Sequence, residues 1–164
     1  MSFQSSSEAA LEYFLFPILR KLMGYKDYDE AHKDRVNHRA LWYELIKAIN
    51  FNDPTTLANV IFNNKDVYCG IRNITEYNGI READPGIISV WVDASKRCDP
   101  EDNSSCTVTA EDMDIVLHNN GTIDELKTQI GMLVEALNEA QRLTDILYEG
   151  DTDGTNPTDD TSST

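Results

Sequence analysis

The sequence predicts an α+β fold with N-terminal helices, a small, mainly antiparallel sheet of three to four strands, and a long C-terminal helix packed on that sheet. Three observations predict it. Apolar residues recur at helical spacing in the first third of the chain, short extended runs begin at Val67, and a capped amphipathic stretch runs from Thr122 to Tyr148. The chain has 164 residues, 40% of them hydrophobic, which suits one domain with a buried core. We expect a single α+β domain over residues 1–149 and a disordered acidic tail over residues 150–164.

The first predicted helix begins at a capping box, Ser5-x-x-Glu8, in which each side chain satisfies a free backbone N–H group. Pro17 lies inside the helical pattern, and because proline has no backbone N–H, it should kink or split the helix. Gly24 is a favourable C-terminal stop. The apolar residues that set the spacing are Leu11, Phe14, Leu15, Ile18, Leu19 and Leu22.

Two further helices are expected before the strands begin. The charged stretch Tyr25 to Asp34 has no clear period, and a second helix is predicted from about Lys33 to Asn50. Asp53 followed by Pro54 predicts the start of a short third helix, with the aspartate as N-cap and the proline in the first turn. The apolar residues on these two helices are Leu41, Trp42, Leu45, Ile46, Ile49, Leu57, Val60 and Ile61.

The middle of the chain predicts strands. Residues 67–74 form the first, and Asn78-Gly79 is a turn dipeptide that could close a hairpin. Residues 87–92 are apolar on both faces except at Ser89, which predicts a central strand. A further strand is expected to end at Leu117, with a bulge or break near Ala110 where the alternation slips. From the central strand we select Ile87, Val90 and Trp91 as candidate core or assembly residues.

The last predicted helix opens with a second capping box, Thr122-x-x-Glu125. Its apolar seam alternates spacings of four and three, like a coiled coil. Further apolar residues beside the seam widen it, so we expect the helix to cover the sheet as part of the core. The candidate core or assembly residues on this helix are Leu126, Ile130, Leu133 and Leu137.

The charge of the chain limits its partners. There are 29 acidic and 14 basic residues, giving a formal net charge of −15 at pH 7. The negative electrostatic potential of such a chain repels phosphate backbones, so direct nucleic-acid binding through a basic patch is not expected. Basic protein partners are favoured. The longest apolar run, residues 13–19, is too short to span a bilayer, and we expect no membrane partner.

The sequence contains no recognisable catalytic, cofactor or metal motif. The odd number of cysteines (Cys69, Cys98 and Cys106) without a signal peptide favours a reducing compartment. The spacing of Cys98 and Cys106 matches no common zinc motif, and whether these two pair is left open. The histidines are His32, His38 and His118, and each is expected at a helix or strand end. We therefore predict no catalytic, cofactor-binding or metal-binding residue, and a protein that is not an enzyme.

The order of elements resembles the tail-terminator and tail-completion proteins of tailed bacteriophages. The resemblance runs from about Leu45 to Leu137 and covers two helices, the segment from Val67 to Gly70, the proline-led strand from Asp84, the strand that ends at Leu117, and the closing helix. It implies a non-enzymatic virion protein that forms a ring at the tail or neck, and partners that are other copies of itself and other virion proteins. The implied location is the virion, and the host cytoplasm during assembly. The long N-terminal helical region departs from the pattern and leaves a head–tail connector open.

Two other classes of function are kept as alternatives. One is an acidic inhibitor that mimics DNA or blocks a host defence by binding a basic partner, which the net charge favours. The acids do not form long phosphate-like rows outside the tail, which counts against it. The other is a small enzyme whose site is assembled from scattered residues.

Overall fold

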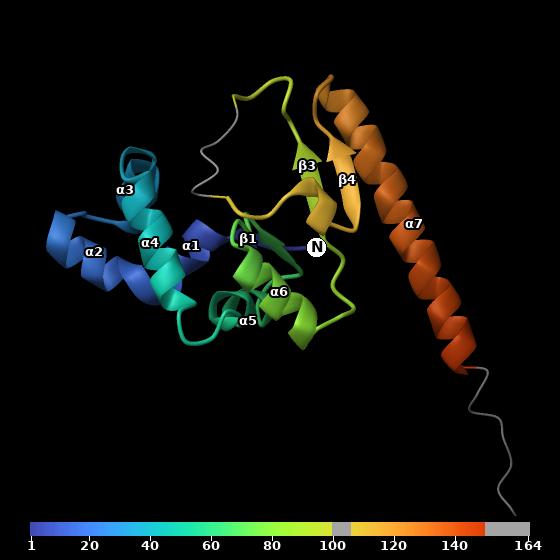
Figure 1. Ribbon diagram of the computed structural model, residues 1–164, viewed down its shortest axis with the longest axis horizontal. Helices are drawn as coiled ribbons and strands as arrows, with labels where there is room; N and C mark the ends of the chain where they lie inside the picture. The colour runs from blue at the N-terminus through green and yellow to red at the C-terminus, as the bar shows by residue number, and fades with distance from the viewer. Residues whose placement is uncertain (100–105, 150–164) are drawn as a thin grey trace, which may run out of the picture. The chain divides into compact units, whose positions relative to one another are not determined.

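The computed structural model describes residues 1–99 and 106–149 and combines helices with short strands (Figure 1). The mixed fold and the long C-terminal helix are therefore confirmed. The predicted sheet of three to four mainly antiparallel strands is wrong, because the described strands form two separate two-stranded parallel sheets. The expected acidic tail lies outside the described residues.

The chain divides into two compact units. The first unit is Met1–Trp91 with Cys98–Val116, and the second is Val92–Arg97 with Leu117–Thr164. The expectation of a single domain over residues 1–149 stays a prediction.

The first predicted helix forms as three consecutive segments: α1 (Ser6–Ala10), a π-helical turn η1 (Leu11–Leu15) and α2 (Phe16–Met23). The N-cap is Ser5, and its capping box with Glu8 is present as predicted. Pro17 lies in the first turn of α2, directly after the π-helical turn. Since proline donates no hydrogen bond, the register changes just before it, and the N–H of Phe16 reaches back to the carbonyl of Leu11. Gly24 ends α2 in the left-handed conformation at φ 76°.

The next helices do not begin where they were predicted. α3 (Tyr28–Asp34) occupies most of the stretch that was expected to be irregular, and its N-cap Asp27 accepts a hydrogen bond from the backbone N–H of Glu30. A short 3₁₀ turn, η2 (Arg35–Asn37), precedes α4 (Arg39–Ile49). α5 (Thr56–Phe62) starts two residues later than predicted, because Asp53 Oδ1 instead accepts from the backbone N–H and hydroxyl of Thr55.

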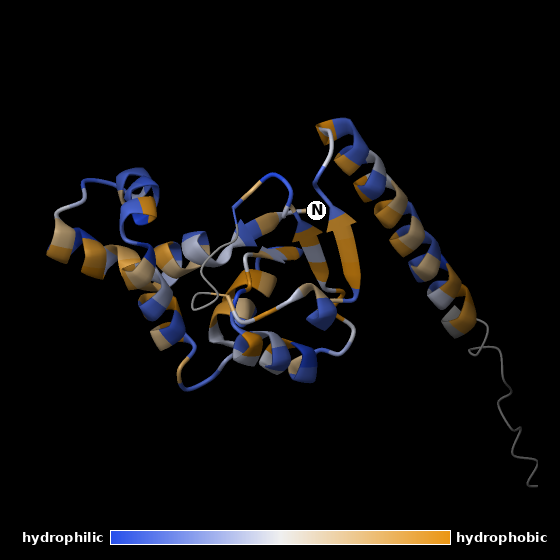
Figure 2. Ribbon diagram, turned by 45° about the horizontal axis from the view of Figure 1, so that its top comes forward, coloured by the Kyte–Doolittle hydropathy of each residue, from blue (hydrophilic) through white to orange (hydrophobic). Residues whose placement is uncertain are grey.

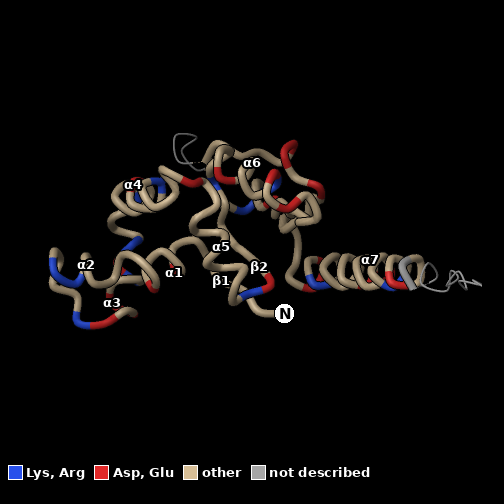
Figure 3. The backbone as a smooth tube through the Cα atoms, turned by 90° about the horizontal axis from the view of Figure 1, so that it is seen from below, with Lys and Arg blue, Asp and Glu red and all other residues tan. Residues whose placement is uncertain are grey.

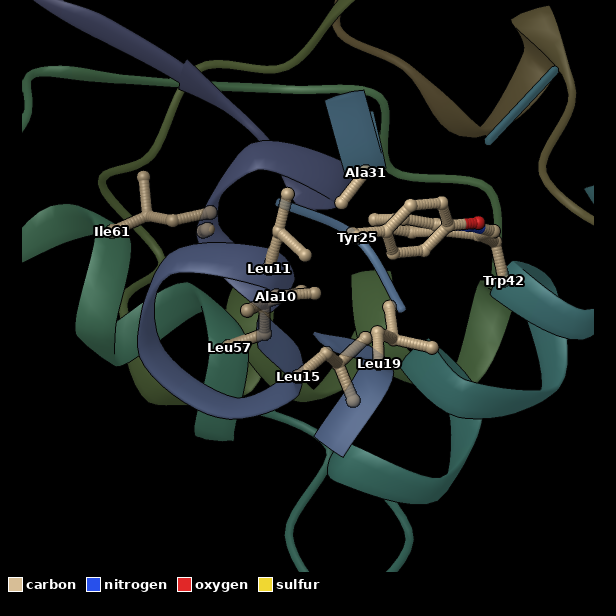
Figure 4. Close-up of a cluster of buried hydrophobic side chains, with 10 residues drawn as sticks. Ala10, Leu11, Leu15, Leu19, Tyr25, Ala31, Trp42, Leu57 and Ile61 are labelled. Carbon is tan, nitrogen blue, oxygen red and sulfur yellow. The ribbon is translucent and has the colours of Figure 1, made fainter. Parts of the chain in front are cut away.

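The buried core of the first unit is built by these helices (Figure 4). Leu11, Leu15 and Leu19 lie four residues apart and are almost completely buried, together with side chains from each neighbouring helix. Small residues of α1 allow close approach of α4 and α5, which both contact it. The other members of the core are Ala9, Ala10, Tyr25, Ala31, Trp42, Leu57 and Ile61.

The first sheet is formed by β1 (Phe3–Ser5) and β2 (Val67–Cys69), which pair in parallel with Gln4 opposite Tyr68. A parallel pair needs a long crossover, and here the crossover is the helical region between the two strands. The sequence signal for β1 is weak, since three residues before a capping box carry no alternating pattern. β2 is shorter than the predicted strand, which was expected to run to residue 74.

The predicted hairpin at Asn78-Gly79 is wrong, because residues Ile74–Ala83 form helix α6. Asn73 caps this helix by accepting from the backbone N–H of Thr75 at 2.8 Å, which stops the extended chain that precedes it. Gly79 serves packing: a Cβ at this position would lie 2.8 Å from Cγ of Pro54. The glycine therefore reflects close contact with the loop before α5.

The second sheet contains β3 (Val90–Asp93) and β4 (Ile115–His118), with a 3₁₀ turn η4 (Ala110–Asp112) at the predicted break near Ala110. The N–H of Ile115 donates to the carbonyl of Ser89 at 3.1 Å, and the N–H of Asn119 donates to the carbonyl of Asp93 at 2.7 Å. From the first bond to the second, the residue number rises by the same amount in both strands, as it does when strands are parallel. The predicted central strand thus has only one described neighbour.

Helix α7 (Ile123–Glu149) is the main element of the second unit and the longest helix of the structure. Its predicted capping box is present: Glu125 Oε2 accepts from the N–H of Thr122, and Thr122 Oγ1 accepts from the N–H of Glu125. Near its start, Gln129 exchanges two hydrogen bonds with the backbone of His118, at 2.8 and 2.9 Å. These bonds tie the helix to the end of β4.

Candidate functional site

The seven candidate residues from the sequence do not belong to the buried core. Ile87 precedes β3, and Val90 and Trp91 are its first two residues. Ile87 and Trp91 are half-buried, and Val90 is exposed. On α7, Ile130 is 42% exposed. The other three, Leu126, Leu133 and Leu137, are half-buried. The buried core of the first unit is made by the N-terminal helices, and the expectation that α7 is a core helix stays a prediction.

α7 presents a partly exposed apolar stripe, which we call the α7 face. Between residues 123 and 147, no side chain of this helix is fully buried. Figure 2 shows hydrophobic and hydrophilic residues alternating along its length. The α7 face follows the heptad positions that meet a partner helix in a coiled coil. Its members are Ile123, Leu126, Ile130, Leu133, Leu137, Ala140, Thr144 and Leu147.

Charge is segregated away from the α7 face. Among the positions that flank it up to residue 147, Lys127 is the only charged residue, although the chain as a whole is strongly acidic. The acids of the same stretch lie on the outer positions of the helix, where they remain in solvent beside a second helix. These acids are Asp124, Glu125, Glu135, Glu139 and Asp145.

A second candidate site is a groove on the first unit, which we call the basic groove. It has a volume of about 930 Å³ and is bounded by Ser5–Ser7, α4, the loop that follows α4, and the segment from Gly70 to Glu76. Four cations line it: Arg35, Arg39, Lys47 and Arg72. Sequence reasoning missed this groove, although Arg39, Tyr43 and Lys47 repeat every four residues and so predict one face of a helix. Lys47 Nζ lies 5.9 Å from the centroid of the Tyr43 ring.

A buried carboxyl, Glu76, also lines the basic groove. Glu76 is 5% exposed, and burial raises its pKa above the usual range for glutamate. Tyr68 donates its hydroxyl to Glu76 Oε1 at 2.5 Å, which favours the charged form and partly offsets the effect of burial. The same burial, together with the adjacent carboxylate, raises the pKa of Tyr68 well above its ordinary value. This pair fixes β2 to α6 by a hydrogen bond within the fold.

A serine and a histidine also meet at the edge of this region. Ser7 Oγ lies 3.3 Å from His32 Nε2, and Arg35 donates its Nε–H to the same hydroxyl at 3.3 Å. Burial is the main cause of the lowered pKa of His32, so its ring favours the neutral form. The ring packs on Tyr28 and against the edge of Trp42. A catalytic triad needs a carboxylate on the second ring nitrogen, and residues 1–99 and 106–149 supply no such bond.

The second unit contains a polar cluster around Asp93, at the end of β3. Its carboxylate accepts from the N–H of Ser95 at 3.0 Å and from Asn120 Nδ2 at 2.6 Å, and it lies 3.4 Å from His118 Nδ1. Hydrogen bonds from Ser95 are the main cause that lowers the pKa of Asp93 to about 2. The cluster holds the ends of both strands together.

Metal and cysteine chemistry add no further site within the described part of the chain. Residues 1–99 and 106–149 contain no group of three or more His, Cys, Asp or Glu side chains arranged to hold a metal ion. Cys69, Cys98 and Cys106 are free thiols, and burial raises the pKa of Cys69. Among the described helices, none has the length and apolar character needed to cross a membrane.

Comparison of the chain with protein-family models, with curated proteins and with solved structures found no match.

Proposed function

We propose that this protein is a non-enzymatic structural protein that works by self-assembly, in which α7 packs against α7 of a neighbouring copy. The α7 face is the observation that carries the proposal. It is a continuous apolar stripe along a helix of 27 residues, and it is left largely exposed in the single chain. Such a helix is about 40 Å long, which is long enough for several turns of helix pairing.

The identity of the residues on the α7 face supports helix pairing. Isoleucine and leucine alternate over the first half, with isoleucine at the positions where it favours a pair of parallel helices. When two copies pair, the positions beside the α7 face bring almost no charges of like sign together. The net charge still makes two copies of this chain repel each other at long range. A second copy is therefore a better occupant than a basic partner, which would find no acids on this face.

The proposed setting is the virion of a tailed bacteriophage, at the tail or neck, with other virion proteins as further partners. Support for this setting comes from the order of N-terminal helices, β3, β4 and a closing helix. The segment expected to form a hairpin is helical, so the resemblance now rests on fewer elements. In this setting the protein is a ring-forming tail terminator or connector component, present in the host cytoplasm until assembly.

The alternative, an acidic inhibitor of a basic partner, has one local feature in its favour. The start and one face of α3 carry a cluster of acids around a shallow depression. A basic partner could dock there without involving α7. The acids in this cluster are Asp27, Asp29, Glu30 and Asp34.

The molar mass of the protein in solution tests the proposal. We expect size-exclusion chromatography with light scattering to give an oligomer for the wild type and a monomer for Leu133→Asp, because a charge on the α7 face would be buried without a partner. The matched control is Met132→Asp, which adds the same charge one residue away, at a position that is 67% exposed and off the face. It should assemble like the wild type. A wild type that stays monomeric at high concentration would overturn the proposal.

A further inference from the structure

The basic groove reverses the charge of the molecule locally. It is lined by four of the chain's 14 basic residues but by only two of its 29 acids, Glu44 and Glu76. Glu76 is 5% exposed and accepts a hydrogen bond from Tyr68, so its carboxyl group is engaged within the fold. In a chain with net charge −15, a groove of opposite sign is a specific feature of one surface. It selects an anionic ligand, and it does so whether or not α7 self-associates.

We propose that the basic groove binds an extended, acidic peptide segment of a partner protein. Two cations line one wall. Arg39 and Lys47 lie eight residues apart on α4, about 12 Å along the helix axis, with Tyr43 between them. In an extended peptide, residues four apart share one face and lie about 13 Å apart. A segment with acids four residues apart therefore matches the spacing of the two cations on this wall.

The other surfaces of the groove fit a peptide better than a phosphate polymer. Phe51 follows α4 and is 82% exposed, and the ring of Tyr43 lies half-buried beside Lys47. These rings can cover the apolar part of a bound segment, whereas the cations bind its carboxylates. A volume of about 930 Å³ is close to the upper limit for small-ligand sites and suits a short segment. Figure 3 marks the basic residues of α4 in blue.

Contacts within the fold or the course of the chain place three of the four cations in the groove. Arg35 is held by its Nε–H bond to Ser7 Oγ at 3.3 Å. Lys47 lies 3.8 Å from Glu44 on the same helix, and exposed pairs of this kind are weak enough for a carboxylate ligand to compete. Arg72 approaches from the segment that follows β2. The groove thus has cations on both of its walls.

The test is a binding titration of the full-length protein, followed by fluorescence anisotropy. The probe is a labelled peptide of about 12 residues in which aspartate and serine alternate, so that its acids share one face when it is extended. We expect saturable binding that weakens as salt increases. Arg39→Glu with Lys47→Glu should weaken binding by about tenfold or more. The milder pair Arg39→Gln with Lys47→Gln should also weaken it, with an unchanged circular dichroism spectrum.

The matched control is Arg20→Glu with Lys21→Glu on α2. It changes the net charge by the same amount, and neither residue lines the groove. This variant should bind the peptide like the wild type. Equal losses in both double variants would show that only the overall field matters and would overturn the proposal. Binding of an asparagine–serine peptide, tighter binding of single-stranded DNA at the same residues, or no binding of the acidic peptide would overturn it as well.

Discussion

The contrast between Leu11 and Leu133 gives the most direct check on where the core of this protein lies. Leu11 is fully buried among the N-terminal helices, so Leu11→Ala leaves a cavity and should lower the free energy of unfolding by about 2–5 kcal/mol. Leu133 is half-buried on α7, so Leu133→Ala should cost about 1 kcal/mol in a single chain. The two substitutions remove the same atoms, and they differ only in the environment of the side chain.

Urea denaturation followed by circular dichroism measures both effects. At low protein concentration, where copies are separate, we expect the ranking given above. At high concentration the effect of Leu133→Ala should increase, because assembly stabilises the folded form by mass action, whereas that of Leu11→Ala should stay constant. If Leu133→Ala costs as much as Leu11→Ala in the dilute protein, α7 belongs to the core of the single chain and the argument for pairing fails.

Two further predictions concern polar groups. The pKa of Asp93 is lowered to about 2, so its stabilising contribution is complete above the unfolded value near 4 and is lost as pH falls through 2. The protection factor of the Ser95 amide against hydrogen exchange should therefore fall in that window, and an unchanged protection factor would contradict the assignment. Ser5→Ala removes the capping box of α1 and should cost about 1 kcal/mol in thermal unfolding. Ser2→Ala, a control outside the cap that removes only exposed hydrogen bonds with Asp66, should cost less.

Local signals in the sequence predicted several elements correctly. The capping boxes at Ser5 and Thr122 and the stop at Gly24 all depend on residues within one helical turn, and each is present. The interruption at Pro17 was also predicted, because proline lacks a backbone N–H and so removes a hydrogen bond of its own helix, whatever that helix packs against. Such features need no knowledge of the rest of the fold.

The errors came from features that depend on distant residues. Asn78-Gly79 matches a hairpin turn, but Asn73 caps a helix ahead of it and the glycine packs on Pro54, which is remote in sequence. The parallel pairing of β1 with β2 joins residues 64 apart, so no local pattern indicates it. The predicted sheet of three to four strands is therefore replaced by two separate two-stranded sheets.

The candidate sites also differ in whether they depend on neighbouring or on distant residues. The heptad pattern of the α7 face was visible in the sequence, whereas its exposure was not. The basic groove combines Arg35 and Arg39 with Arg72 and with Ser5–Ser7, which the fold brings together from three regions. Only the Arg39–Lys47 repeat could have indicated it, and in an acidic chain that repeat resembles an ordinary solvated helix face.

The π-helical turn at Leu11–Leu15 determines what the deletion of one residue from the N-terminal helix would do. Each residue of an α-helix turns the chain by about 100°. Deleting one residue within the turn could restore regular α-helical bonding before Pro17, and yet it would rotate Leu19 and all of α2 away from the side chains they now meet. The N-terminal helix should therefore tolerate substitution at its exposed positions far better than the loss of a single residue.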